Sequence, residues 1–392
     1  MEELSEFAGK FSSENNIKNY DINIEGAVAK GENYLGEVVF FNITPKDSSK
    51  PFHFIRKKSK CPKDTKEKAA IRIASQREFY VYQTVFPEMK DFLKRHKTNS
   101  TMNILPEVYW VQEEENQRMM ILENMKYSGY RMLDKKLQMN HEKVTLVLET
   151  YAKFHSISFA MKELEPEKFK RLTSSMDDVW CHFKSVFDAE NYFGPLLRDV
   201  LKKLRENGRT DLALKYKPIE DDVENVVYID VDPEDRMVVC HGDSWNNNML
   251  FKNDEEGNPQ SVCLIDFQIS SLSTPVLDLC QFLLSAGDKE VLNNVEDYLK
   301  LYHQFLSDTL KNYEIDVSNL FSLEKLMNQW KKYANTGLVI AISTIQVSLS
   351  EGEEMPEDMN LLTYTDSSEM KNCDLFDRRV LDLLISFGEK YL

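Results

Sequence analysis

The pattern of hydrophobic and polar positions divides the chain into a first third rich in strands and a mostly helical remainder. Residues 20–29 alternate well enough for a strand, and residues 37–43 form a second apolar, β-branched run after a glycine-containing turn. Residues 51–57 alternate in polarity, which predicts a third strand. Residues 106–112 and 118–122 flank a polar turn and predict a second hairpin.

A helix is predicted between the third strand and the second hairpin. Residues 64–86 contain no Gly or Pro, and one helical face carries Ile71, Ser75, Glu78, Tyr82 and Val85. We expect Pro87 to end this helix. The order of strands and helix in the first third is that of the small lobe of a protein-kinase-like enzyme.

Helical periodicity dominates from residue 144, where an amphipathic helix is predicted over 144–163, and helices resume from Pro275. The sequence therefore predicts an α+β, bilobal fold. Residues 1–122 would form a small antiparallel-sheet lobe with one main helix, and residues 123–392 a large, mostly helical lobe. The hinge is expected near residues 121–126.

Composition narrows the classes of function. The 392 residues carry a net charge of −16, which argues against nucleic acid as a partner. The first residues lack the features of a signal peptide, and no apolar stretch is long enough to span a bilayer. We expect a cytoplasmic protein with reduced thiols and no evident obligatory protein partner. Cys240, Cys263 and Cys280 lie in apolar runs and are expected to be buried in the core.

The chemistry is concentrated in residues 239–251, where His241, Asp243 and Asn248 have the spacing His-x-Asp-x-x-x-x-Asn. In kinase loops such an Asp receives the proton of the acceptor hydroxyl and the Asn holds Mg²⁺. Asp266, which precedes Phe267 after a hydrophobic strand, is expected to be the other metal ligand. Asp243 alone could instead be the N-cap of a helix starting near Ser244, but Asn248 and Asp266 favour the kinase interpretation.

Three neighbouring residues are predicted to support this loop. His241 is expected to bond the backbone near the metal site, and Gly242 to permit a tight backbone there. Asp278, near the start of a helix, is either a first-turn carboxylate favoured by the helix dipole or a brace for the catalytic loop.

The small lobe should supply a lysine for the phosphates and a helix glutamate to hold it. Glu78 is the predicted glutamate. Lys57 is the predicted lysine, and Arg56 and Lys58 remain possible because the end of the strand is uncertain. The ATP site would be completed by a turn whose backbone N–H groups cover the phosphates, comprising Gly31, Asn33 and Gly36, and by hinge residues for adenine, Glu123 and Met125.

The acceptor pocket is predicted from residues 165–235, Trp245 and the helix over residues 330–349. Aromatic side chains in these segments would either line an apolar pocket or pack in the core, namely Trp180, Phe187, Tyr192 and Phe193.

These residues resemble the ecdysteroid kinase-like family, also called CHK kinase-like. Trp245 after the Asp and Gln268 after Asp266-Phe267 are its distinguishing marks relative to choline and aminoglycoside kinases. The likeness extends over about residues 20–350. The sequence departs from the family pattern in two places. At the end of the third predicted strand, Arg56, Lys57 and Lys58 replace a single Lys, and at the hinge Asn124 replaces an Asp.

The resemblance implies a protein-kinase-like fold, ATP, Mg²⁺ and a small-molecule hydroxyl acceptor. We therefore expect an ATP-dependent kinase that transfers the γ-phosphoryl group to an ecdysteroid-like or xenobiotic alcohol. The alternatives are a choline- or aminoglycoside-type kinase, and a catalytically inactive protein of the same fold that binds a small lipid.

Overall fold

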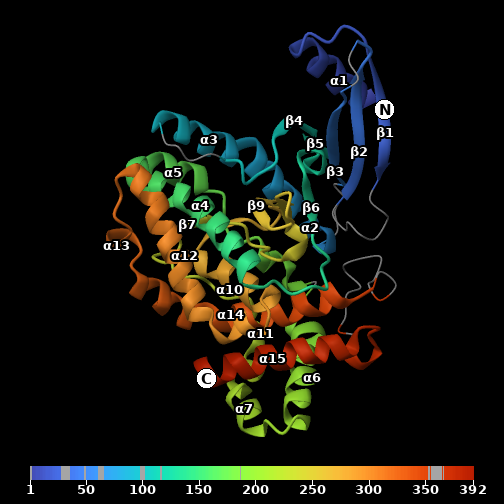
Figure 1. The fold of residues 1–392 in the computed structure, drawn as a ribbon. Coiled ribbons are helices and arrows are strands. Elements are labelled where there is room, and N and C mark those ends of the chain that lie inside the picture. Colours follow the sequence, from blue (N-terminus) through green and yellow to red (C-terminus); the bar gives the residue numbers. More distant parts are fainter. Residues whose placement is uncertain are drawn as a thin grey trace.

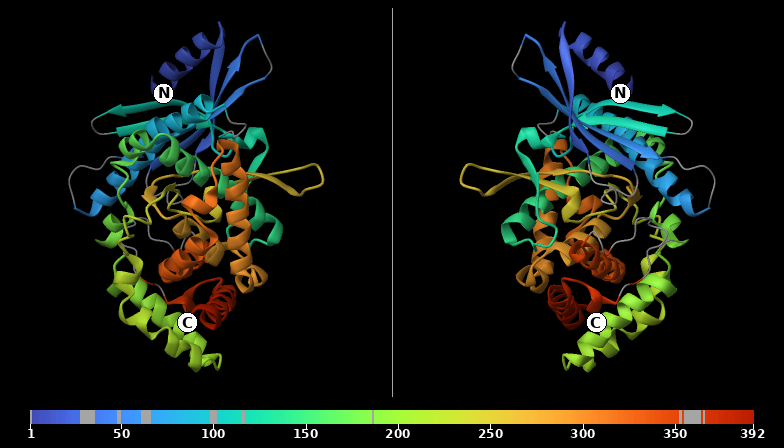
Figure 2. Two further views of the ribbon diagram at one scale, coloured as in Figure 1. Left: turned by 90° about the vertical axis from the view of Figure 1, so that its left-hand side faces the viewer. Right: turned by 90° about the vertical axis from the view of Figure 1, so that its right-hand side faces the viewer.

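The chain has a mixed α+β fold with two lobes, as predicted (Figures 1 and 2). A small lobe built on an antiparallel sheet lies at one end, and helices fill the other end. The computed structural model describes residues 2–27, 36–47, 50–60, 66–97, 102–114, 117–185, 187–351, 354, 364 and 366–392.

The small lobe contains a five-stranded antiparallel sheet in the order β1-β2-β3-β5-β4. Its strands are β1 (Tyr20–Ala27), β2 (Gly36–Pro45), β3 (Phe52–Lys60), β4 (Val108–Glu114) and β5 (Gln117–Glu123). The five predicted strands are confirmed, although residues 28 and 29 of the first lie outside the described part of the chain. Lys57 pairs with Val38 and Met120, so it lies on a strand with neighbours on both sides.

Helix α1 (Glu2–Glu14) covers one face of this sheet and was not predicted. Its buried side chains Leu4, Phe7, Ala8 and Phe11 have helical spacing, which was the available signal. The Phe7 ring meets Phe54 of β3 edge to face, with their centroids 5.1 Å apart. The first third of the chain is therefore less uniformly strand-rich than its pattern indicated.

The predicted helix before the second hairpin does not end at Pro87. Helix α2 (Lys66–Tyr80) passes through a π-helical turn, η1 (Val81–Val85), into α3 (Phe86–Arg95). Pro87 is the second residue of α3, directly after the π-helical turn. The expectation was wrong because the helix changes from α to π geometry in the turn before Pro87 and so continues through it.

The large lobe begins after β5 with η2 (Met125–Ser128), β6 (Tyr130–Met132), α4 (His141–Leu164), α5 (Pro166–Thr173), η3 (Trp180–Ser185), η4 (Ala189–Phe193), α6 (Gly194–Glu206), α7 (Thr210–Lys215), α8 (Lys217–Asp221) and α9 (Val223–Val227). It continues with β7 (Val238–Cys240), η5 (Asn246–Asn248), β8 (Met249–Asn253), β9 (Pro259–Leu264), β10 (Ser271–Ser273), α10 (Pro275–Ala286), α11 (Lys289–Asn293) and α12 (Val295–Leu310). It ends with η6 (Lys311–Tyr313), α13 (Val317–Leu320), α14 (Leu323–Leu349), η9 (Ser367–Glu369) and α15 (Cys373–Tyr391).

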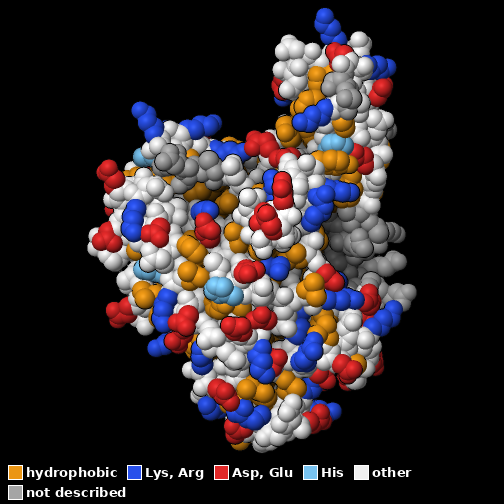
Figure 3. Space-filling model, in the orientation of Figure 1, with side chains coloured by type: hydrophobic (Ala, Val, Ile, Leu, Met, Phe, Trp, Pro, Cys, Tyr) orange, Lys and Arg blue, Asp and Glu red, His pale blue; other side chains and the backbone are white. Residues whose placement is uncertain are grey.

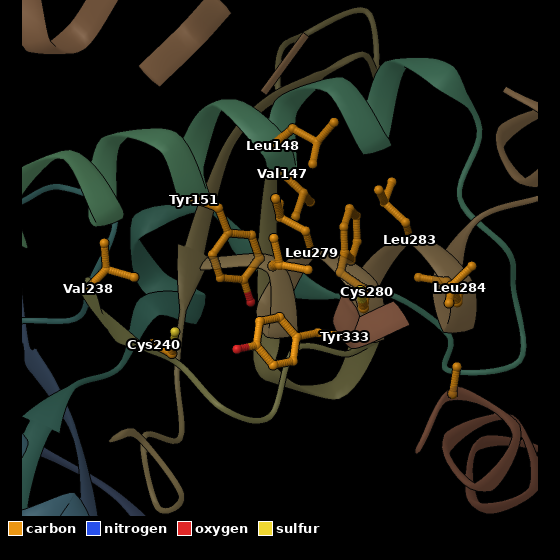
Figure 4. Close-up of a cluster of buried hydrophobic side chains, with 14 of the residues drawn as sticks. Val147, Leu148, Tyr151, Val238, Cys240, Leu279, Cys280, Leu283, Leu284 and Tyr333 are labelled. Carbon is orange, nitrogen blue, oxygen red and sulfur yellow. The ribbon is translucent and has the colours of Figure 1, made fainter. Parts of the chain in front are cut away.

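The main core lies where α4, α10, α14 and β7 meet (Figure 4). Val147, Leu148 and Tyr151 of α4 point toward Leu279 and Leu283 of α10. The predicted burial of three cysteines is confirmed, for Cys240, Cys263 and Cys280. This packing fixes β7 and the start of α10, the two elements that flank the candidate catalytic loop.

We propose that the lobe boundary lies where β5 ends at Glu123 and η2 begins at Met125, close to the predicted residue 122. The two lobes also share packing. Side chains of α2, α3 and the inner face of β5 belong to the same buried cluster as the large lobe, whereas α1 and the outer sheet face form a separate cluster.

The surface in Figure 3 shows acidic and basic side chains interspersed, with hydrophobic side chains in small groups. Among the described residues, no helix is long and apolar enough to cross a membrane.

The packing of α1 gives the first testable prediction. Phe7→Ala should lower the free energy of unfolding by about 3–5 kcal/mol, because it removes a buried ring and leaves a cavity. Denaturant titration followed by circular dichroism measures this change. Glu6→Ala, on the exposed side of the same helix, is the control. Equal small losses for both variants would show that α1 does not stabilise the sheet.

Candidate active site

The side chain of Asp243 is held by three donors at the centre of the loop after β7. Its Oδ2 accepts hydrogen bonds from Asn248 Nδ2 at 2.8 Å and Trp245 Nε1 at 3.2 Å. Its Oδ1 accepts one from Gln281 Nε2 at 3.3 Å. The first helical turn that follows is η5, whose N-cap position is Trp245. The alternative that Asp243 caps a helix near Ser244 is therefore wrong.

His241 and Gly242 shape the loop backbone as predicted. The Nε2–H of His241 donates to the carbonyl oxygen of Ile265 at 2.9 Å, and its Nδ1 accepts from the backbone N–H of Asp243 at 3.2 Å. Gly242 has φ +86°, and a Cβ there would lie 2.3 Å from the carbonyl oxygen of Ile269. Only glycine fits this close approach.

Asp278, at the start of α10, supports the loop after β7 through hydrogen bonds and is not only a first-turn carboxylate of its helix. It accepts hydrogen bonds of 2.8 Å from the backbone N–H groups of His241 and Gly242 and from Ser244 Oγ. Burial alone would raise the pKa of Asp278, but hydrogen bonds, led by the one from His155, lower it. The carboxylate therefore stays ionised in the interior.

His155 of α4 completes this buried network. Its two ring nitrogens lie 3.1 Å from Asp278 Oδ2 and 2.9 Å from the Tyr302 hydroxyl. Ligand atoms of His155, Cys240 and Asp278 lie within 4.8 Å of one another, which is close enough for a metal ion. These atoms are already hydrogen-bonded, with Cys240 Sγ donating to the carbonyl oxygen of Thr274, so we assign them a structural role.

Lys57 of β3 bridges the two lobes. Its Nζ donates to Glu78 Oε1 of α2 at 2.7 Å and to Asp266 Oδ1, after β9, at 3.1 Å. Burial alone would lower the pKa of Lys57, but the charges of Asp266 and Glu78 outweigh it and raise the pKa. Lys57 is therefore a fixed cation, and burial raises the pKa of its partner Glu78.

The other two candidate cations lie elsewhere. Arg56 pairs with Glu37 at 2.5 Å and with Glu3 at 3.6 Å, and Lys58 pairs with Glu3 at 2.7 Å. Strand alternation places Arg56 on the face that carries Phe54, against α1. The geometry thus favours Lys57 among the three possibilities.

Asp266 has a left-handed backbone, with φ +68°. This conformation is unfavourable for a residue with a Cβ and recurs at functional sites. Its carboxylate also affects Asp243, because burial raises the pKa of Asp243 and the negative charge of Asp266 raises it further. The two carboxylates therefore act on one another across the candidate site.

The predicted nucleotide-contact residues are only partly described. Gly31 and Asn33 lie outside the described residues. Gly36 begins β2, and a Cβ there would lie 2.4 Å from the carbonyl oxygen of Lys58, which gives this glycine a packing role of its own. Glu123 and Met125 lie at the crossover from β5 into η2, where the Glu123 side chain accepts a hydrogen bond from Ser128 Oγ.

A cavity of about 810 Å³ opens beside Asp243 and Trp245. The predicted segments line it: residues from 173–236, Trp245 and one face of α14. Its apolar wall comprises Met176, Trp180, Phe183, Phe187, Phe193, Tyr228, Ile229, Ile340 and Val347. Of the four aromatic side chains for which pocket lining and core packing were both considered, Trp180, Phe187 and Phe193 line the cavity. Tyr192 packs in the core, where it is hydrogen-bonded to Ser343 Oγ.

Sequence reasoning missed Gln281, which joins the loop to α10. Its Oε1 accepts the Ser244 N–H at 2.8 Å while its Nε2 reaches Asp243. Gln281 lies three residues after Asp278, so both lie on the same face of α10. That spacing was the available signal.

A lysine held by two carboxylates, a hydrogen-bonded Asp–Asn pair and a cavity beside the Asp are features expected of a small-molecule phosphotransferase. The chain belongs to the ecdysteroid kinase-like family, whose model matches residues 30–315. The resemblance noted from the sequence is thereby confirmed.

Other comparisons are more distant. The search of curated proteins found no match. Among solved structures, the GDP and kanamycin complex of APH(2")-IIia is 13% identical, with a TM-score of 0.39 over 83% of this chain and 94% of that chain. The GDP complex of wild-type aminoglycoside 2'-phosphotransferase-IIIa is 14% identical, with a TM-score of 0.38 over 87% and 97%. These two likenesses are too remote to add to the argument.

The role of Asp278 gives the second prediction. Asp278→Asn should lower the free energy of unfolding by about 3–5 kcal/mol, because an amide NH₂ group would face buried donors. Thermal and denaturant unfolding measure the loss. Asp288→Asn makes the same chemical change at the N-cap of α11, where Asn serves as well as Asp, and should be nearly neutral. A neutral Asp278→Asn variant would contradict the bracing role.

Proposed function

We propose that the protein is an ATP-dependent kinase that transfers the γ-phosphoryl group to a hydroxyl of an ecdysteroid-like or xenobiotic alcohol. The observation that carries this proposal is the position of Asp243. Its carboxylate borders the apolar cavity, is hydrogen-bonded to Asn248 and is electrostatically linked to Asp266, the partner of Lys57.

Asp243 orients the acceptor hydroxyl and takes up its proton as the oxygen attacks phosphorus. Burial raises the pKa of Asp243, which makes the carboxylate a stronger base than an exposed Asp. Hydrogen bonds from Trp245 and Gln281 fix the direction of the carboxylate. This arrangement supplies the positioning on which phosphoryl transfer depends.

Lys57 contacts the phosphates, and Glu78 holds its side chain. Asn248 and Asp266 are the proposed ligands of Mg²⁺, which would offset charge on the phosphates. The residues fit such an ion, because the amide nitrogen of Asn248 is engaged by Asp243 and leaves the carbonyl oxygen as the ligand atom. Asp266 supplies carboxylate oxygen, also a ligand that Mg²⁺ prefers. The segment 31–36, which the sequence predicts to be a turn, and the hinge at Glu123 and Met125 would complete the nucleotide site.

The cavity favours a neutral acceptor over a cationic one. Its volume of about 810 Å³ lies within the range of small-molecule sites, and its wall is largely aromatic and aliphatic. Asp177, Asp178 and Asp230 also line it and make a choline- or aminoglycoside-like cation the second candidate. Asp177 and Asp230 are paired with Arg77 and Arg236, and burial raises the pKa of Asp178, so the negative charge available to a cationic ligand is reduced.

A phosphoryl-transfer screen tests the proposed function. Purified protein with Mg²⁺ and γ-labelled ATP would be offered ecdysteroids, other sterols, glycosides, xenobiotic alcohols, choline and an aminoglycoside. We expect label on a neutral alcohol. Asp243→Asn should lower turnover by about 10²–10⁴-fold with nearly unchanged nucleotide affinity. Label on choline or the aminoglycoside alone would favour the second candidate, and normal turnover in Asp243→Asn would contradict its role.

Lys57 and Lys58 form a matched pair for a further prediction. Lys57→Met should lower turnover by about 10²–10³-fold, because it removes the cation from the phosphates. The fold should persist, since the raised pKa of Glu78 lets its carboxyl become neutral when Lys57 is gone. Lys58→Met removes a partly exposed pair with Glu3 and should leave turnover close to normal. Steady-state kinetics compare the two variants, and equal losses of turnover would contradict the assignment of Lys57 as the phosphate-contacting cation.

A further inference from the structure

Arg77 lies next to Glu78 on α2, and its side chain is only 5% exposed. Its Nη1 donates to the carbonyl oxygens of Asp177 at 2.9 Å and Ser270 at 2.5 Å. Its Nη2 donates to the carbonyl oxygen of Ser175 at 2.7 Å and to Asp177 Oδ1 at 2.8 Å. One guanidinium thus joins the small-lobe helix to two separate segments of the large lobe.

The first of these segments forms the rim of the acceptor cavity. Asp177 lines the cavity directly. Its carboxylate also lies 4.0 Å from His182 of η3, the short helix that carries Trp180 and Cys181 into the cavity wall. Helix α2 packs against η3 as well.

The second segment continues from the proposed metal ligand. Ser270 follows Asp266 by four residues, and its hydroxyl donates to the carbonyl oxygen of Cys240, immediately before the catalytic loop. Arg77 therefore contacts the segment that follows Asp266 and the cavity rim at once.

We propose that Arg77 is a positioning residue that couples occupancy of the nucleotide site to the conformation of the acceptor-cavity rim, residues 175–181. The inference rests on the proposed function. When phosphates engage Lys57, the adjustment of Glu78 moves or stiffens α2, and the bonds of Arg77 pass this change to the rim. Coupling of this kind is reciprocal. If a bound nucleotide raises the affinity for the acceptor, a bound acceptor raises the affinity for the nucleotide by the same factor.

The chemistry of arginine suits this role. A planar guanidinium presents five donors in a fixed fork, and lysine cannot make the same four bonds from a single nitrogen. Because the guanidinium is buried, any movement of α2 that broke these bonds would leave donors unpaired, so α2 and the rim are constrained to move together.

Cys181 offers a reporter that needs no identified acceptor. It is exposed at the cavity wall, and its Sγ donates to the carbonyl oxygen of Asp178 at 2.9 Å. The rate of its alkylation by iodoacetamide would be followed by mass spectrometry, with and without saturating Mg²⁺ and the non-hydrolysable nucleotide AMP-PNP. Cys373, on α15, is the internal reference.

We expect the nucleotide to slow alkylation of Cys181 by about fivefold or more while the rate at Cys373 stays constant. Arg77→Lys should lose this effect while retaining its fold and nucleotide binding. Arg95→Lys is the matched control and should retain the full effect. Arg95 makes exposed bonds to Glu88 of its own helix and to Glu165, and none of these residues lines the cavity. Asp177→Asn leaves the three carbonyl acceptors of Arg77 in place and should weaken the slowing of Cys181 alkylation by the nucleotide. It replaces Arg77→Lys as the test variant if Arg77→Lys does not fold.

The outcomes separate the two proposals. Nucleotide binding measured by calorimetry, with an unchanged Cys181 rate in the unsubstituted protein, would overturn the coupling alone. An undiminished effect in folded Arg77→Lys, or in Asp177→Asn, would also overturn it, since the nucleotide would then act on Cys181 by another route. Absence of nucleotide binding to the unsubstituted protein would contradict the proposed function, and the coupling with it.

Discussion

The ion pair network at Lys57 is the interaction on which the geometry of the candidate active site depends. One ammonium group, carried by β3, is shared between Glu78 of α2 and Asp266 after β9. Removing such charges from water is costly, so a buried ion pair stabilises little by itself. Its contribution is geometric: it fixes a strand, a helix and a loop that are distant in sequence around one point.

The large lobe has a corresponding anchor in Asp278. Its carboxylate accepts hydrogen bonds from two backbone N–H groups and one side chain of the candidate catalytic loop, and from His155 of α4. The hydrophobic packing of α4 and α10 holds this anchor in place (Figure 4). Asp278 and His155 thus support the loop that carries Asp243 without lining the cavity, whereas Asp243 itself borders it.

The sequence predicted those parts of the molecule whose signals are local. The loop from His241 to Asn248 is a contiguous motif in the sequence. Strand alternation likewise placed the side chains of Lys57 and Arg56 on opposite faces of the sheet. The π-helical turn before Pro87 was not predictable, because residue patterns do not distinguish it from an α-helix. Arg77 and Gln281 were overlooked because their partners are 100 and 38 residues away in sequence, and only the folded chain brings them together.

The central claim is that Asp266 and Lys57 form a nucleotide site that depends on a divalent cation. Calorimetric titration of AMP-PNP into the protein, with and without Mg²⁺, compared with Asp266→Asn, tests it most directly. The account predicts binding that requires Mg²⁺ and is weakened by more than about tenfold in the variant, since even partners outside the metal shell cost that much. Equal binding by the two proteins, or binding indifferent to Mg²⁺, would contradict it.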